Sequence, residues 1–398
     1  RWQNDNRWAT MNAPNPIHVF HKKDPHMATA AHNSKGSTGC LRSFIAPGAP
    51  ATRTPCDGSE SEMRVEFGFT PQWYHEYCGI DFGESWHLNP RYRRECTVKM
   101  CHELNRQVPE LRLGGDNPDA RAASLDGVHG ATLVALLFGV PVEYYSQNWP
   151  AAKHKHLSDN DIRVLEPPDL DASPVFTQLM EQIDFIEKDW GHVPGYLNWQ
   201  GVLNNAFRLR GQEIYADILL NGPLMQRLFE VITHTMIEGM RRVYARQSAG
   251  GINNRHATVS NCLVNMVSPG QYAEFLMPWD KKIAEAFDSF GIHNCAWNVD
   301  PYIKDYASFE KLCYVDMGIE SDLRRARELC PGARRAVMYK PTDLVNKTLS
   351  EIQVDLVRIR KELSPCDIVM ADIDYGAPPD RVMAFAKLAE ETLKIDPD

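Results

Sequence analysis

A histidine and a cysteine stand two residues apart in the segment from Gly291 to Asn298, just after a stretch with helical periodicity. On an extended strand, residues i and i+2 point to the same side, so His293 and Cys295 are expected to converge on one ion or one substrate atom. Neutral imidazole and thiolate are ligands that Zn²⁺ prefers. The pair therefore predicts a metal centre, against the alternative that both side chains merely pack at the end of a strand.

The second half of the chain must position this pair, and there short apolar runs alternate with amphipathic helical patterns. The expected strands are 195–199, 256–262, 292–296, 312–316, 336–339 and 367–372, and the expected helices between them are 215–245, 269–290, 321–330, 350–363 and 379–393. Strands that alternate with helices predict a parallel sheet. Repeated units of this kind, without a glycine-rich phosphate turn, favour an α/β fold of the (β/α)₈ TIM-barrel type over a doubly wound open sheet.

Polar residues gather at the carboxyl ends of the expected strands, which form the active face of such a barrel. They are Asn198, Asn261, His293 with Cys295, Asp316, Lys340, and Asp372 with Asp374. Buried polar groups need partners, and barrel interiors are filled mostly by branched apolar residues. Packing alone therefore does not account for all of these residues, and we expect a substrate site among them.

The rest of the chain sets limits on the class of protein. Residues 1–62 are rich in Pro, Gly, Ser, Thr, Asn and His without sustained periodicity, which predicts an irregular N-terminal extension before a barrel domain over residues 63–398. The formal net charge of -9 argues against a general nucleic-acid or membrane-surface binder but allows a local basic pocket. The longest apolar run, about twelve residues from Ala131 to Val142, is too short to span a membrane. Scattered cysteines and the lack of a signal segment indicate a cytoplasmic protein.

Several segments of the chain resemble the uroporphyrinogen decarboxylase superfamily. They are 267–275 (VSPGQYAEF) with Pro278, 291–295 (GIHNC), 316–318 (DMG), 331–333 (PGA) and 378–382 (PPDRV), with 138–142 (FGVPV) and 167–170 (PPDL) upstream. The superfamily has two main branches, porphyrinogen decarboxylases without a metal, and zinc methyltransferases that pass methyl groups between corrinoid proteins or folates and thiols. The spacing of His293 and Cys295 is similar to the start of the zinc motif in the methyltransferase branch. The arginine motif of the decarboxylases is not visible.

The resemblance implies a methyltransferase in which His293, Cys295 and Asp316 hold zinc and leave one position open for a thiol. Asp316 matches the place of a carboxylate ligand in the distantly similar cobalamin-independent methionine synthases. The methyl donor would be a corrinoid (cobalamin) carried by a partner protein or a small methylated compound.

One departure from the methyltransferase pattern concerns the last βα loop. The methyltransferases supply a final cysteine there, whereas this chain has Ala-Asp-Ile-Asp at 371–374. Asp372 or Asp374 could replace that cysteine, which would make the site harder and the zinc more Lewis acidic. Cys262 and Cys313 are predicted core residues of their strands, but each lies one strand from the pair and could supply the missing sulfur.

A metal-free decarboxylase or lyase of the same fold is the main alternative. In that enzyme Asp372 or Asp374 would act as general acid, while Asn198, Asn261 and Lys340 would hold a carboxylated substrate. A third hypothesis is a barrel without catalysis that serves as a binding subunit of a corrinoid assembly. Both enzyme hypotheses expect a small-molecule substrate and leave a homodimer open.

Overall fold

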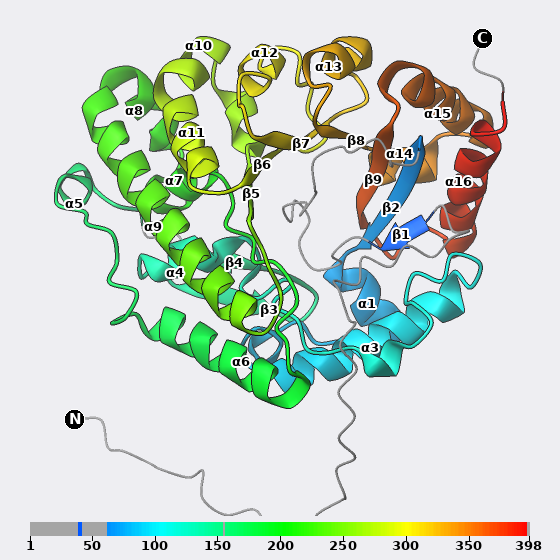
Figure 1. The fold of residues 1–398 in the computed structure, drawn as a ribbon, viewed down its shortest axis with the longest axis horizontal. Helices are drawn as coiled ribbons and strands as arrows, with labels where there is room; N and C mark the ends of the chain where they lie inside the picture. Colours follow the sequence, from blue (N-terminus) through cyan, green and yellow to red (C-terminus); the bar gives the residue numbers. More distant parts are fainter. Residues whose placement is uncertain (1–38, 42–61, 154–155, 396–398) are drawn as a thin grey trace, which may run out of the picture. The chain divides into compact units, whose positions relative to one another are not determined.

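The main feature of the computed structural model, which describes residues 39–41, 62–153 and 156–395, is an all-parallel sheet of seven strands (Figure 1). Its order is β1-β2-β9-β8-β7-β6-β5. The strands are β1 (Gly39–Leu41), β2 (Met63–Phe69), β5 (His256–Ser260), β6 (Ser289–His293), β7 (Leu312–Met317), β8 (Arg334–Met338) and β9 (Cys366–Ile373). The strands from β5 to β9 are neighbours in chain order, as successive βα units require. The predicted α/β class is confirmed.

Helices connect these strands and lie on the outer side of the sheet in Figure 1. They are α10 (Pro269–Gln271), α11 (Met277–Glu285), α12 (Ile303–Tyr306), α13 (Leu323–Leu329), α14 (Pro341–Asn346), α15 (Leu349–Leu363) and α16 (Pro379–Thr392). The predicted continuous helix over 269–290 is interrupted in the structure, where a π-helical segment (Tyr272–Leu276) separates α10 from α11. Pro278 follows directly, and a proline has no N–H to donate and crowds the preceding turn.

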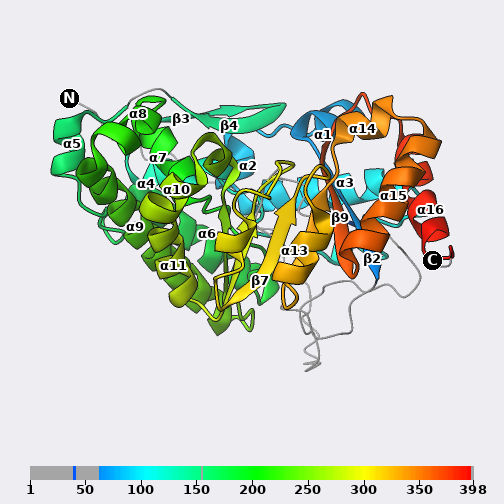
Figure 2. The same cartoon turned by 90° about the horizontal axis from the view of Figure 1, so that it is seen from above.

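The first half of the described chain is mainly helical. Its helices are α1 (Pro71–Cys78), α2 (Glu84–Leu88), α3 (Pro90–Gln107), α4 (Leu133–Leu137), α5 (Asp159–Arg163), α6 (Pro174–Trp190), α7 (Val202–Arg210), α8 (Glu213–Leu220) and α9 (Gly222–Ala249). An antiparallel hairpin of β3 (Val142–Tyr145) and β4 (Asn148–Ala152) lies on the same side as α7 and α8 in Figure 2. The predicted helix over 215–245 is two helices that meet at Asn221, since Pro223 fits a first turn but not a helix interior.

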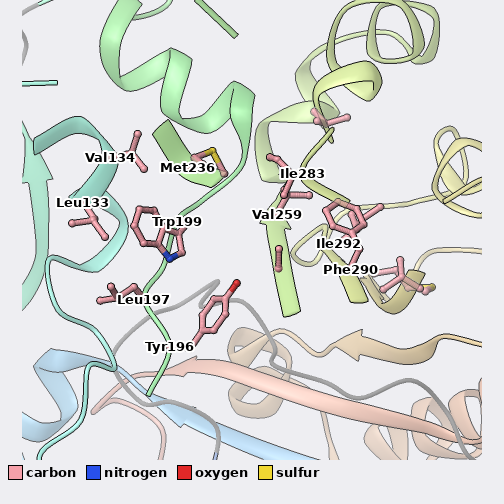
Figure 3. Packing of buried hydrophobic residues seen from close by; sticks show 14 of the residues in the cluster. Leu133, Val134, Tyr196, Leu197, Trp199, Met236, Val259, Ile283, Phe290 and Ile292 are labelled. Atoms are coloured by element: carbon pink, nitrogen blue, oxygen red, sulfur yellow. The ribbon is translucent and has the colours of Figure 1, made fainter. Parts of the chain in front are cut away.

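The segment 195–199 is not the strand that its apolar pattern predicts. The backbone N–H of Tyr196 donates to Oδ1 of Asp126 at 3.0 Å, and the Tyr196 hydroxyl accepts from the N–H of Thr258 in β5 at 3.1 Å. Leu197 points to the opposite side from Tyr196 (Figure 3). The segment therefore joins the core through side chains and single hydrogen bonds, without a ladder of backbone pairs.

Trp199 anchors this segment in the hydrophobic core. Its ring is fully buried near Leu133 of α4 and Met236 of α9 (Figure 3). A Cβ at Gly239 of α9 would lie 2.5 Å from the ring, so only glycine lets α9 approach this closely. Truncation of a buried tryptophan to alanine costs about 3–5 kcal/mol of unfolding free energy. Packing therefore fixes the chain just before α7.

The predicted N-terminal extension over residues 1–62 lies almost entirely outside the described residues. Within it, Gly39–Leu41 forms β1, which pairs in parallel with β2. Over residues 62–153 and 156–395, no helix has the length and apolarity needed to cross a membrane.

Candidate metal centre

Two thiols and one imidazole converge at the carboxyl ends of β5 and β6. Cys262 comes two residues after the end of β5, His293 is the last residue of β6, and Cys295 lies in the following loop. The strands pair in parallel with Ser260 opposite His293, which brings their ends together. The three ligand atoms lie within 4.8 Å of one another. Sγ of Cys295 is 2.7 Å from Sγ of Cys262 and 3.0 Å from Nε2 of His293.

A turn, and not an extended strand as predicted, brings Cys295 beside His293. Strand β6 ends at His293, and Cys295 has a φ of 57°, in the left-handed region. That conformation costs a non-glycine residue about 1–3 kcal/mol unless its surroundings hold it. Here the N–H of Gly318 donates to the carbonyl of Trp297 at 2.8 Å, and a Cβ at Gly318 would lie 2.3 Å from the carbonyl oxygen of Ala296. The loop after β7 thus supports the loop that carries the thiol.

Asp316 of β7 lies on the opposite edge of the His293 ring from the thiols. Its Oδ2 accepts from Nδ1 of His293 at 2.6 Å and from the Tyr314 hydroxyl at 2.9 Å. Its Oδ1 accepts from the backbone N–H of Asn294 at 2.7 Å. The structure therefore does not place this carboxylate among the sulfur atoms, as its predicted role of third ligand requires. It instead fixes the ring so that Nε2 faces the two sulfurs.

Amide side chains tie the two loops of the centre together. Oδ1 of the buried Asn294 accepts from Nδ2 of Asn265 at 3.2 Å and from the Tyr306 hydroxyl at 3.3 Å. The same Asn265 amide donates to the carbonyl of Cys262 at 3.2 Å. The residue between His293 and Cys295 is thereby linked to the loop that carries Cys262.

Charge at the centre is shared between the imidazole and one thiol. Burial acts to lower the pKa of His293, but the charges of Asp316 and Cys262 outweigh it and raise the pKa to about 10. The hydrogen bond from Cys295 lowers the pKa of the Cys262 thiol well below its ordinary value, against the effect of burial. The same bond, then burial, raises the pKa of Cys295, and the negative charge of Asp372 adds a smaller contribution. The imidazole of His293 and the thiol of Cys262 thus favour each other's charged forms.

Asn261, predicted to bind substrate, points into the protein behind Cys262. Its Nδ2 donates to Oδ2 of Asp280 at 2.8 Å, and the Tyr272 hydroxyl donates to the same oxygen at 3.1 Å. Burial raises the pKa of Asp280 to about 6, although these two hydrogen bonds act to lower it. The backbone N–H of Asn261 donates to the carbonyl of His293 at 2.7 Å. Asn261 thus holds the ends of β5 and β6 together.

Asn198 begins a chain of side-chain amides that leads to the centre. Its Oδ1 accepts from Nε2 of Gln200 at 2.8 Å, and Oε1 of Gln200 accepts from Nδ2 of Asn204 at 3.0 Å. Oδ1 of Asn204 accepts from the N–H of Leu263, the residue after Cys262, at 3.2 Å. Nδ2 of Asn198 is buried without a partner in the described residues, so its two N–H groups remain for a ligand.

The other predicted residues lie at the ends of β8 and β9. Nζ of Lys340 is 2.6 Å from Oε1 of Glu320, and both side chains are partly exposed. Oδ1 of Asp374 accepts from the Thr70 hydroxyl at 3.1 Å, and this pair is also exposed. Asp372 is exposed near the end of β9 with a φ of 65°. The structure thus brings none of these three side chains into the thiol and imidazole cluster.

Cys262 is the member of the cluster that the sequence pattern assigns to a strand core. It is instead half-buried and opens the short helix η3 (Cys262–Met266). Cys313, the other cysteine considered for the missing sulfur, lies early in β7, where its Sγ is 3.3 Å from Nδ1 of His256. The place of Cys262 directly after Asn261, itself expected at a carboxyl end, is the signal that could have found it.

Comparison with known proteins gives a likeness in structure only. No family model matches the chain, and no curated protein matches it. A solved structure of a methyltransferase from Methanosarcina mazei superposes with a TM-score of 0.58, over 86% of this chain and 95% of that chain, at 16% sequence identity. At that identity the likeness shows that the two chains share a fold.

Proposed function

We propose that this protein is a zinc-dependent methyltransferase whose metal ligands are Cys262, His293 and Cys295. The observation that carries this proposal is the convergence of two sulfurs and one imidazole nitrogen within 4.8 Å, at the carboxyl ends of adjacent parallel strands. The shared fold with a methyltransferase supports the reaction class. The resemblance of the segment around His293 to the zinc branch of the uroporphyrinogen decarboxylase superfamily supports the same assignment.

The donor set suits a catalytic zinc ion. Two cysteines and one histidine with an open fourth position are a known catalytic combination for zinc. Two thiolates on a tetrahedral zinc lie about 3.8 Å apart, given a Zn–S bond of about 2.3 Å. The Cys262 and Cys295 sulfurs, 2.7 Å apart, would have to separate by about 1 Å to admit the ion. Zinc bound there would lower the pKa of a substrate thiol so that it is a thiolate nucleophile at neutral pH.

The surrounding residues orient the ligands and the substrate. Asp316 holds Nδ1 of His293, which leaves Nε2 for the metal and increases the basicity of the ring. Asn198 offers its unpartnered Nδ2 to a substrate oxygen. Asp372 is close enough to affect the pKa of Cys295, and we assign to it the proton of the incoming thiol. Asp374 and Lys340 would contact the outer part of a substrate, since both side chains are exposed.

The methyl donor in this proposal is a corrinoid on a partner protein or a small methylated compound, and the acceptor is a small thiol. The fold proposed with it is a closed (β/α)₈ barrel made of β2, the five strands β5 to β9, and residues 123–128 and 194–199 in place of two strands, with β1 as an addition to the eight. The hydrogen bond from the N–H of Leu125 to the carbonyl of Pro194, at 2.9 Å, and that between Thr258 and Tyr196 support this closure.

The test combines metal analysis with turnover of a surrogate donor. We expect about one zinc per purified chain, and loss of absorbance of free methylcobalamin when a small thiol is added. A chelator such as 1,10-phenanthroline should abolish this turnover, and added zinc should restore it. Zinc-free protein that keeps full turnover, or purified protein that holds no zinc, would contradict the proposal.

A further inference from the structure

A second feature near the metal centre is a cavity of about 250 Å³ between the β3–β4 hairpin and α7. Its lining residues include Thr132, Pro150, Lys153, His156, Phe207 and Arg208. Two of them, Lys153 and Arg208, carry a permanent positive charge, and no carboxylate of the described residues lines the cavity. The cavity is therefore a local basic pocket in a protein of net negative charge.

Arg208 has few partners for a partly buried guanidinium. Its Nη1 donates to the carbonyl of Asn204, one turn earlier in α7, at 2.8 Å. A guanidinium has five N–H donors, and no carboxylate of the described residues forms an ion pair with Arg208. Burial lowers the pKa of Arg208 to about 10. The charge is thus partly desolvated and no carboxylate of the described residues compensates it, so an anion in the cavity would supply the counterion.

Two buried arginines of the described chain are each held by several protein partners. Arg210, two residues further on, is bound by Asp159 at 2.5 Å and by Asp217 at 2.8 Å. Arg93 donates to the carbonyls of Ser124 and Trp86, at 2.7 Å and 2.8 Å. Arg208 differs from both, because a single hydrogen bond to the described residues leaves most of its N–H groups available to a ligand.

The cavity is linked to the metal centre through α7. Asn204 and Arg208 are four residues apart and therefore lie on one face of the helix. The side chain of Asn204 accepts the N–H of Leu263, next to Cys262. Among the charges that act on Arg208, that of Cys262 favours its protonated form. Helix α7 thus connects the cavity to the loop that carries Cys262.

We propose that this cavity is an anion subsite, in which Arg208 with help from Lys153 binds an oxyanion group, such as a carboxylate or phosphate, of the small-molecule substrate. The assignment to the substrate rests on the proposed function of the adjacent centre. The subsite itself rests on the cationic lining and on the uncompensated guanidinium.

The test measures binding of inorganic phosphate to the full chain by isothermal titration and by the shift in Tm, against chloride at equal ionic strength. We expect phosphate to raise Tm more than chloride does, and Arg208→Gln to weaken phosphate binding about tenfold or more, because a charge-assisted hydrogen bond is lost. The matched control is Arg241→Gln. Arg241 lines the other cavity, of about 370 Å³, together with Glu238 and Glu285, so its loss should leave phosphate binding unchanged.

The outcomes separate the subsite from the proposed function. Equal responses to phosphate and chloride, or full phosphate binding by Arg208→Gln, would overturn the subsite. If Arg208→Gln does not fold, Lys153→Gln serves instead. We expect it to weaken phosphate binding severalfold, and unchanged phosphate binding would overturn the proposal. Zinc content is measured on the same samples. Phosphate binding by a protein without zinc would refute the zinc-dependent methyltransferase but support the anion subsite. A protein that holds zinc but does not bind phosphate would refute the subsite and leave the methyltransferase proposal standing.

Discussion

The carboxyl-terminal edge of the sheet carries polar residues in very different surroundings over β5 and β6 and over β8 and β9. At the carboxyl ends of β5 and β6, His293 is fully buried against the equally buried Asp316 of β7, and the two thiols are held against the imidazole. At the ends of β8 and β9, Lys340 and Asp374 are exposed and pair with nearby polar groups. The difference teaches that position at a carboxyl end is not sufficient for chemistry. A buried cluster of two thiols and one imidazole distinguishes the β5–β6 edge from the β8–β9 edge.

This comparison also bears on the cysteine that the last βα loop lacks. In our proposal the second sulfur comes from Cys262 after β5, on the other side of His293 from Asp372. The centre then keeps a soft donor set of two thiolates and one imidazole, which suits zinc better than a carboxylate substitute would. The predictions below test whether the β5–β6 edge alone holds the metal.

The largest expected effect is on zinc content. Cys262→Ser, His293→Ala and Cys295→Ser should each reduce zinc from about one per chain to a small fraction, because two ligands do not hold the ion in an open site. Elemental analysis after gel filtration measures this, with circular dichroism to show that the fold persists. Cys330→Ser, at a buried cysteine outside the cluster, should keep its zinc. Full zinc occupancy in Cys262→Ser would mean that the third ligand is instead Asp372 or Asp374 at the end of β9.

The second prediction concerns Asp280, which supports the same edge through Asn261. Its folded pKa of about 6 exceeds the unfolded value of about 3.9, so its contribution to stability is fully present below pH 4 and is lost as pH rises through 6. Asp280→Asn still offers an oxygen to Asn261 and Tyr272 but does not ionise. The variant should therefore gain about 3 kcal/mol relative to wild type between pH 4 and pH 7.

Urea unfolding of both proteins across that pH range measures the difference. A difference in unfolding free energy that stays constant from pH 4 to pH 7 would show that Asp280 is not the buried acid we describe. The exposed Asp374 provides the matched control, since Asp374→Asn removes a carboxylate of the other edge, where water solvates it.

The third prediction separates the two roles considered for Asp316. Asp316→Asn should weaken zinc binding about 10- to 100-fold without abolishing it, as expected for a partner of a ligand and not for a ligand. The variant has one acceptor oxygen for three donors, from His293, Tyr314 and Asn294, so at least one of them loses its bond. Competition with a chromogenic chelator measures the affinity. Loss of zinc as complete as in His293→Ala would restore Asp316 as a direct ligand.

Much of the fold could be predicted because its signals are local. Alternating strands and helices identify β5 to β9, and Thr348 with Glu351 forms a capping box at the start of α15. The segment 195–199 could not be predicted correctly, because an apolar run does not show whether a neighbouring strand will pair with it. Its conformation depends on contacts distant in sequence, such as that between Trp199 and Gly239.

The candidate site could be predicted in composition but not in geometry. The types and spacing of His293 and Cys295 indicate a metal centre, yet the turn at Cys295 is set by the approach of Gly318 from the next unit. Spacing also cannot show which ring nitrogen of His293 meets Asp316. The role of Cys262 depends on where β5 ends, and element boundaries are the least certain part of any pattern.

The smallest expected effects are those on the β8–β9 edge. Lys340→Ala should change the free energy of unfolding by less than about 1 kcal/mol, since its pair with Glu320 is exposed to water. Zinc content should stay at wild-type level in Lys340→Ala and in Asp374→Asn, because neither residue belongs to the cluster.

Asp372→Asn should also keep its zinc and its backbone conformation, since asparagine tolerates a positive φ, but should slow turnover if Asp372 accepts the thiol proton. A metal-free decarboxylase would depend on these two aspartates and would not depend on the three metal ligands. If turnover resists chelators and is abolished only by Asp372→Asn or Asp374→Asn, the active edge is β8–β9 and the methyltransferase assignment fails.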